Sequence, residues 1–271
     1  MHLRIDADNA LFYLQKPPGR EGAPSFVFVN ALTGDTGTWE AEIAPALRAA
    51  GFGTLSYNFR GQAESVFAPG LALTPDLIVE DLQRLLAELA PTRPILVGLS
   101  IGGLFAAQAL LRGSSAAGLV LLNTLREIGP RIAWVNDALP ALVAHGGVGL
   151  FLDALMPLLV NGEFAETARA ARLQGGYAPM EPDHGHLNLM RHAGAADWSV
   201  DWGALSLPVL NITGLQDRVF LDRAVVERLL ATIPNHRCED WTDCGHLIPQ
   251  ERGARLVERL IAFGREIEAG R

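Results

Sequence analysis

The chain has 271 residues, of which 49% are hydrophobic, and it carries a formal net charge of −8 with a pI near 5.4. A chain of this length and apolar content can bury one large core and still carry an inserted segment. The acidic balance and the lack of basic runs argue against a nucleic-acid partner, because such binding depends on clustered Lys and Arg. No apolar leader and no apolar run of about 18 residues suggest secretion or a membrane span, so a cytoplasmic protein is expected.

Short apolar runs alternate with segments of helical periodicity along most of the chain. Eight strands are predicted, at residues 3–5, 11–14, 25–30, 53–57, 95–98, 118–123, 209–213 and 236–241. Five helices are predicted, at residues 38–50, 75–89, 102–111, 222–233 and 253–268. This alternation predicts an α/β fold in which a mostly parallel, eight-stranded sheet has helices on both faces. The first two strands are separated by a short polar turn and are expected to pair antiparallel at one edge.

A serine stands where the fifth predicted strand meets the helix that follows it, in the sequence Gly98-Leu99-Ser100-Ile101-Gly102. The two glycines leave room for a turn so tight that a Cβ on either side of the serine would clash. The N-terminus of the helix offers unpaired N–H groups, which favour developing negative charge. The same pattern also arises where a helix simply packs on a sheet, so it indicates a nucleophile only if a base and an acid accompany it.

A candidate base and a candidate acid follow downstream, each just past the end of a predicted strand. His246 could take the proton of Ser100, and Asp217 could orient the imidazole. Asp217 could instead merely cap the turn after it, but Gly214 supplies a turn that lets it point at His246. The other acids within reach of this edge are Asp197, Asp201, Asp222 and Glu127.

In its order of serine, acid and histidine, the chain resembles the α/β-hydrolase superfamily, and within it the carboxylesterase and enol-lactonase group. The resemblance covers essentially the whole chain, including residues 26–30 with Trp39 and residues 57–65. It implies a serine hydrolase that needs no cofactor or metal. By position, the backbone N–H groups of Leu32 and Ile101 would form the oxyanion hole, where each donor could lower the barrier by roughly 3 kcal/mol.

Two positions depart from the family pattern. Asn30-Ala31 stands where the family usually has His-Gly before the oxyanion loop, so the departure bears on the placement of Leu32. Gln62-Ala63 stands where the family more often has another His-Gly. This second departure is interpreted as peripheral to the catalytic residues.

The alternation of strands and helices breaks between residues 125 and 206, where helical stretches at 132–142 and 148–160 occur without a strand. We therefore divide the chain into a hydrolase core, residues 1–124 and 207–271, and a helical insertion, residues 125–206. By the family resemblance, the insertion is a cap over the carboxyl edge of the sheet, where ligands bind. Its apolar side chains Trp134, Phe151 and Met156 are predicted to bind substrate, although such a stripe is equally typical of core packing.

Histidines gather near the end of the insertion, where His184 and His186 flank a glycine and His192 follows. The spacing lacks the helical registration and the separate third ligand of a typical zinc site. We interpret these residues as surface or hinge histidines on an irregular turn and predict no metal.

The sequence thus predicts a serine hydrolase that cleaves an ester, thioester or lactone of a small to medium, partly apolar molecule through an acyl-enzyme. The same residues could serve carbon–carbon bond hydrolysis, acyl transfer or a ligand sensor of low turnover. Ser100 excludes the haloalkane dehalogenase branch, which uses an aspartate there. We expect a small-molecule substrate and neither a nucleic-acid nor a membrane partner, and the oligomeric state is left open.

Overall fold

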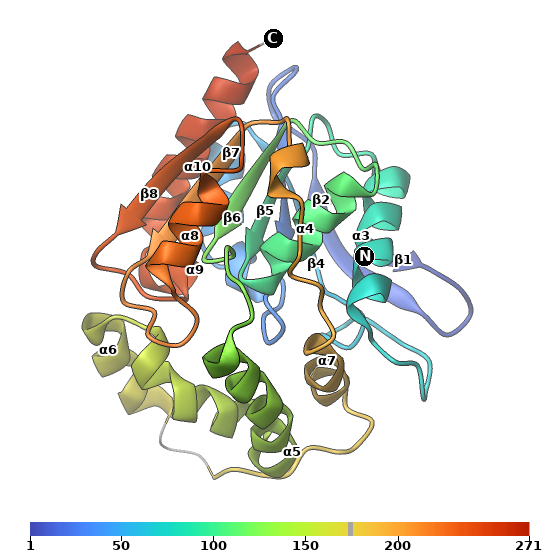
Figure 1. Ribbon diagram of the computed structural model, residues 1–271. Helices are drawn as coiled ribbons and strands as arrows, with labels where there is room; N and C mark the ends of the chain where they lie inside the picture. Colours follow the sequence, from blue (N-terminus) through green and yellow to red (C-terminus); the bar gives the residue numbers. More distant parts are fainter. Residues whose placement is uncertain (173–175, 271) are drawn as a thin grey trace.

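Eight strands form one sheet in the order β1-β2-β4-β3-β5-β6-β7-β8 in the computed structural model, which describes residues 1–172 and 176–270 (Figure 1). β2 runs antiparallel to both β1 and β4, and the remaining neighbours are parallel. The predicted fold class and the antiparallel edge pair are therefore confirmed. The strands are β1 (His2–Arg4), β2 (Ala10–Lys16), β3 (Ser25–Val29), β4 (Gly53–Tyr57), β5 (Ile95–Leu99), β6 (Gly118–Leu122), β7 (Val209–Gly214) and β8 (His236–Trp241).

The helices connect these strands and also fill the insertion. They are α1 (Gly37–Glu40), α2 (Ile43–Ala49), α3 (Pro75–Leu89), α4 (Ile101–Leu111), α5 (Pro130–Leu159), α6 (Gly162–Arg172), α7 (Gly185–Ala193), α8 (Arg223–Leu230), α9 (Ile248–Glu251) and α10 (Gly253–Ala269), with a short 3-10 turn at Trp202–Ala204. The single helix predicted at 38–50 was wrong, because Glu42 leaves helical geometry (φ −141°, ψ −47°) and separates α1 from α2.

Alternate side chains of the central strands enter two separate hydrophobic cores, one on each face of the sheet. Val27 and Val29 pack on the face covered by α3, α4 and α8, whereas Phe26 and Phe28 pack on the face covered by α1, α2 and α10. Every residue of strands β3 to β7 is buried. Because both faces are covered, the loops at the carboxyl ends of these strands start from fixed positions.

Close backbone contact holds the turn between β5 and α4. A Cβ on Gly102 would lie 2.3 Å from the carbonyl oxygen of Val29, and a Cβ on Gly98 would lie 2.3 Å from the backbone of Gly103. Ser100 between them has φ 56° and ψ −123°, a strained conformation for a residue with a side chain. The helix can thus approach the sheet closely enough to force Ser100 into this turn.

The insertion between β6 and β7 forms a helical layer at one end of the sheet, drawn below the strands in Figure 1. Among the described residues, α5 is the one helix whose length and composition would allow it to cross a membrane. Gly147 breaks this helix (φ 69°, ψ −176°), which leaves two arms shorter than the roughly 20 residues that a span requires. The arms fold over the sheet edge as a cap.

The irregular turn predicted around the cap histidines was wrong, because these residues begin and continue α7. His184 caps the helix, since its Nδ1 accepts the backbone N–H of His186 at 3.2 Å, and His192 lies in the last turn. At the end of the insertion, Trp202 and Leu205 pack into the core on the face of the sheet covered by α3, α4 and α8 rather than with the cap.

Replacing Gly102 by alanine should destabilise the fold, because the new Cβ would meet the carbonyl oxygens of Val29 and Asn30 at 2.3 and 2.4 Å. We expect the free energy of unfolding to fall by about 1–3 kcal/mol, measured by urea denaturation. Gly162→Ala is the matched control, because nothing lies within 4 Å of its added Cβ. Equal unfolding midpoints for the two variants would contradict this account of the turn.

Candidate active site

Ser100, Asp217 and His246 come from three loops that follow β5, β7 and β8, and they meet at the carboxyl edge of the sheet. The Nδ1 atom of His246 lies 2.7 Å from Oδ2 of Asp217. All three residues are at most 8% exposed, and Ser100 and His246 line one pocket. Among the described residues no hydrogen bond joins Ser100 to His246. Hydrogen bonds between a nucleophile and its base commonly become short only when substrate binds.

Asp217 both caps its loop and holds the histidine. Its Oδ1 accepts the backbone N–H groups of Val219 and Phe220, each at 2.9 Å, while Oδ2 faces His246. Burial would raise the pKa of the Asp217 carboxyl, but the charge and hydrogen bond of His246, helped by Phe220 N–H and Arg126, hold it below its usual 3.8. The carboxylate therefore stays charged and fixes the imidazole in one orientation.

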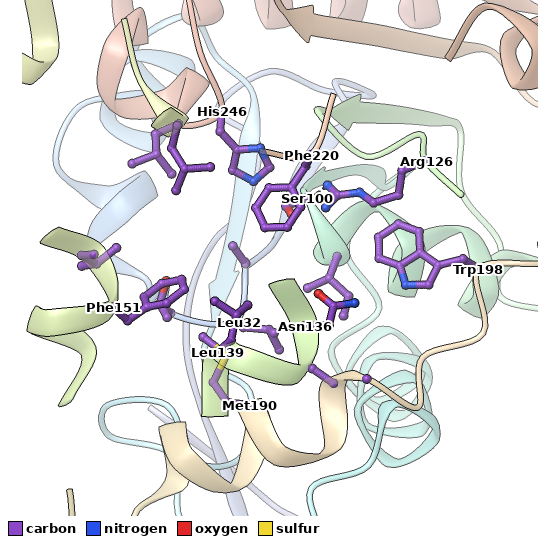
Figure 2. Close-up of a pocket in the computed structure, with 18 residues that line it drawn as sticks. Leu32, Ser100, Arg126, Asn136, Leu139, Phe151, Met190, Trp198, Phe220 and His246 are labelled. Atoms are coloured by element: carbon purple, nitrogen blue, oxygen red, sulfur yellow. Dashed lines mark hydrogen bonds between the residues drawn. The ribbon is translucent and has the colours of Figure 1, made fainter. Parts of the chain in front are cut away.

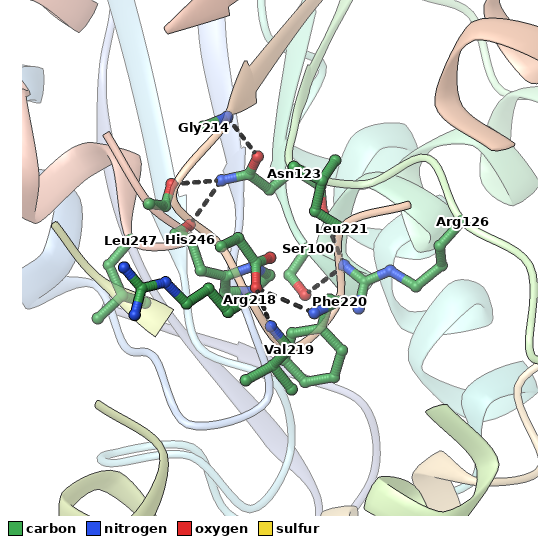
Figure 3. Close-up of polar contacts among 12 residues, drawn as sticks. Ser100, Asn123, Arg126, Gly214, Arg218, Val219, Phe220, Leu221, His246 and Leu247 are labelled. Carbon is green, nitrogen blue, oxygen red and sulfur yellow. Dashed lines mark hydrogen bonds and ion pairs between the residues drawn. The ribbon is translucent and has the colours of Figure 1, made fainter. Parts of the chain in front are cut away.

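Asn123 links the acid and histidine loops through three hydrogen bonds (Figure 3). Its Nδ2 donates to the carbonyl oxygens of Gly245 and His246, both at 2.9 Å, and its Oδ1 accepts the N–H of Gly214 at 2.7 Å. Asn123 sits just past β6 with φ 49°, a region that asparagine tolerates better than most residues. Asn123 was assigned no role in the sequence analysis.

Glu251 fixes the other side of the histidine loop. Its buried carboxylate accepts the backbone N–H groups of Gly245 and Leu247, and also that of Asn161, which lies between α5 and α6 of the cap. A carboxylate that accepts several N–H groups replaces water without leaving donors unpaired. Glu251 therefore joins the loop of His246 to the cap.

The two predicted oxyanion donors also face the pocket. Leu32 and Ile101 both line it, and within the described residues neither backbone N–H donates to an acceptor. Ile101 is the first residue of α4, whose N–H is left free by helix geometry. Both amides are thus available to a ligand oxygen.

Gln62 holds the loop of Ala31 and Leu32, a role that the sequence analysis did not assign to it. Its side chain is fully buried, and its Nε2 donates to the carbonyl oxygens of Ala31 and Leu32 at 2.8 and 3.1 Å. Its Oε1 accepts from Asn30 Nδ2 at 3.0 Å, and Asn30 in turn accepts the indole N–H of Trp39. The two departures from the family pattern therefore contact each other and jointly set the peptide plane of Leu32.

The pocket around Ser100 is a cavity of about 100 Å³ between the sheet edge and the cap (Figure 2). Of the three cap residues predicted to bind substrate, Phe151 lines it. Trp134 does not, and its side chain is 79% exposed, because it points away from the helix face that carries the lining residue Asn136. Met156 is buried but lines two neighbouring hollows instead.

Arg126 is a pocket residue that sequence reasoning missed. It is 5% exposed, and its Nη2 donates to Ser100 Oγ at 3.0 Å and to the carbonyl oxygen of Asn123 at 2.6 Å. Its guanidinium lies within 5 Å of the ring centres of Trp198 (4.8 Å) and Phe220 (4.7 Å). A signal was present in the sequence, since Arg126 lies in the loop that follows the central strand β6, and site residues gather at such loops.

A family model described as alpha/beta hydrolase fold matches residues 24–252. The chain belongs to the α/β-hydrolase family. This α/β hydrolase is 25% identical over 255 residues, 92% of each chain, to 3-oxoadipate enol-lactonase 1 of Acinetobacter baylyi. A malate-bound thermophilic esterase from Thermogutta terrifontis is 25% identical with a TM-score of 0.77, covering 96% and 94% of the two chains. The enol-lactonase from Burkholderia xenovorans LB400 is 23% identical with a TM-score of 0.76, covering 94% and 96%.

Gln62→Ala should misplace the oxyanion loop of this α/β hydrolase, because both carbonyl oxygens that hold the loop lose their donor. We expect kcat for an aryl ester to fall about 10- to 100-fold with a smaller change in KM. The reason is that the Leu32 N–H would be misplaced, and this donor is needed mainly in the transition state. The assay is steady-state hydrolysis below the melting temperature of each variant.

Gln83→Ala is the control, because Gln83 contacts the carbonyl oxygen of Arg112 rather than this pocket. A Gln62→Ala enzyme whose kcat stays within about twofold of the wild type would show that the loop is held by other contacts.

Proposed function

We propose that this α/β hydrolase is a serine hydrolase that cleaves an ester, thioester or lactone through an acyl-enzyme. The observation that carries the proposal is the strained Ser100, which shares a buried pocket with His246 while Asp217 holds the histidine ring. Such a backbone conformation persists only where surrounding structure enforces it, and such sites are commonly functional. The names of the relatives, esterase and enol-lactonase, favour ester or lactone substrates.

In this mechanism Ser100 attacks the carbonyl carbon and His246 takes the hydroxyl proton. Asp217 orients the imidazole and stabilises its cationic form, and the N–H groups of Leu32 and Ile101 bind the oxyanion. His246 then gives the proton to the leaving oxygen or sulfur as its bond to the carbonyl carbon breaks, and the acyl group stays on Ser100. An ester or thioester releases its alcohol or thiol, whereas a lactone ring opens with the new hydroxyl still attached to the acyl group. Water, activated by His246, releases the acid and restores the serine.

The pocket supports a small substrate with an apolar part. Its cavity has a volume of about 100 Å³ next to Ser100. Leu139, Phe151 and Met190 line one side with apolar surface. A short acyl chain or a small ring fits this space better than a long-chain lipid.

Ser100→Ala should abolish turnover of a short-chain aryl ester, because the attacking oxygen is removed while the two glycines of the turn remain. We expect a loss of at least about 1,000-fold. A fluorophosphonate probe followed by mass spectrometry should label the wild type at Ser100 and leave the variant unlabelled.

Ser115→Ala, on an exposed loop, is the control and should keep both activity and labelling. More than a tenth of wild-type turnover in purified Ser100→Ala would refute the nucleophile assignment.

Phe151→Ala should enlarge the pocket and shift preference toward longer acyl chains, by about 1–3 kcal/mol in transition-state binding. The measurement is kcat/KM across an acyl-length series, with thermal melts run in parallel. Trp134→Ala, on the same helix but outside the pocket, should leave selectivity unchanged. If Phe151→Ala lowers only the melting temperature and slows all esters alike, Phe151 serves packing and not selection.

A further inference from the structure

The pocket contains a buried cation without a carboxylate partner. Within the described residues, no Asp or Glu forms a salt bridge with Arg126. The charge of Asp217 acts on the pKa of Arg126, but the two oxygens of Asp217 already serve His246 and the backbone of its own loop. A buried guanidinium is costly unless it is paired, so its retention in a substrate pocket points to a ligand.

The contacts of Arg126 leave one edge of its guanidinium available. Nε donates to the carbonyl oxygen of Thr124, and Nη2 donates to Asn123 and to Ser100 Oγ. An arginine has five N–H donors, and among the described residues no acceptor bonds to the two on Nη1. Burial lowers the pKa of the Arg126 guanidinium to about 10, against the opposing effect of Asp217, so the group remains charged at neutral pH.

The pocket is polar at one end and apolar at the other. Figure 2 shows Arg126 and Trp198 on one side of Ser100 and Phe151 on the opposite side. Trp198 and Phe220 sandwich the guanidinium between ring faces, which holds its plane while keeping water away. Asn136 of α5 also lines the pocket, and its side chain forms no hydrogen bond with the described residues.

Resting on the serine hydrolase function proposed above, we infer that the natural substrate is an anionic ester or lactone whose carboxylate binds Arg126, with Asn136 as a second donor. Arg126 lies 3.0 Å from the nucleophilic oxygen, so the carboxylate must be only a few bonds from the scissile carbonyl. The apolar remainder of the substrate would lie toward Phe151. The charged N–H donors on Nη1 attract a carboxylate more strongly than they attract an uncharged ester, which distinguishes such substrates from neutral esters.

The test compares monomethyl glutarate with a neutral isostere in which the free carboxylate is replaced by a primary amide and the methyl ester is kept. The rate of methanol release is measured for both. The wild type should favour the carboxylate at least tenfold in kcat/KM, and Arg126→Gln should bring the ratio near one, chiefly through KM. Arg126→Lys should retain part of the preference, because it keeps the positive charge but not the two N–H donors of Nη1. Arg228→Gln is the control for net charge, since Arg228 is exposed and pairs with Glu127.

A second measurement does not depend on turnover of these esters or on a folded variant. Butyrate should slow fluorophosphonate labelling of wild-type Ser100, and butyramide should protect at least tenfold less well. Equal protection, or no protection by either compound, overturns the inference. So does a wild-type ratio near one, or an Arg126→Gln enzyme that loses both glutarate substrates alike, as a purely structural arginine would. Failure of the probe to label Ser100 would instead refute the serine hydrolase function itself.

Discussion

The candidate active site depends on one close backbone contact, because α4 begins directly against the end of β3 and leaves no space there for a side chain. Gly102 lies beneath the carbonyl oxygens of Val29 and Asn30, and Gly103 packs under Thr124. The same turn is tied to β6, because Ser100 N–H donates to the carbonyl oxygen of Leu122 and Thr124 Oγ1 donates to that of Ser100. The strain at Ser100 is therefore held by packing and backbone hydrogen bonds on both sides. The serine hydroxyl faces the pocket as a result.

Neutral amides and one carboxylate, none of them in the predicted catalytic set, position the loops around this turn. Gln62 holds the oxyanion loop, Asn123 joins the acid and histidine loops, and Glu251 ties the histidine loop to the cap. Each satisfies backbone groups that would otherwise be buried without partners. This explains how Asn30-Ala31 can replace the usual family residues: Ala31 is not among the residues with positive φ, so the loop does not require glycine there.

The pocket separates two kinds of recognition. Apolar cap side chains such as Phe151 surround the space on one side of the nucleophile, and the Arg126 guanidinium occupies the other. A buried charge discriminates strongly between ligands, because its interaction with them is weakly screened. In our proposal, the apolar side chains of α5 select the size of the substrate and Arg126 selects its charge.

The sequence alone determined the fold class and placed each strand to within two residues at either end, because strands buried on both faces have continuous apolar runs and tight turns require glycine. It also placed Ser100, Asp217 and His246 beyond the ends of three parallel strands, and the structure brings these residues to one sheet edge. Only the tertiary structure decided the roles of Gln62, Asn123, Arg126 and the exposed Trp134. Their environments come from residues far away in the chain: Gln62 meets a loop some thirty residues earlier, and Arg126 is sandwiched by Trp198 and Phe220. Local periodicity carries no information on such contacts. It shows which residues lie on the same face of a helix or strand, and not which distant residues pack against that face.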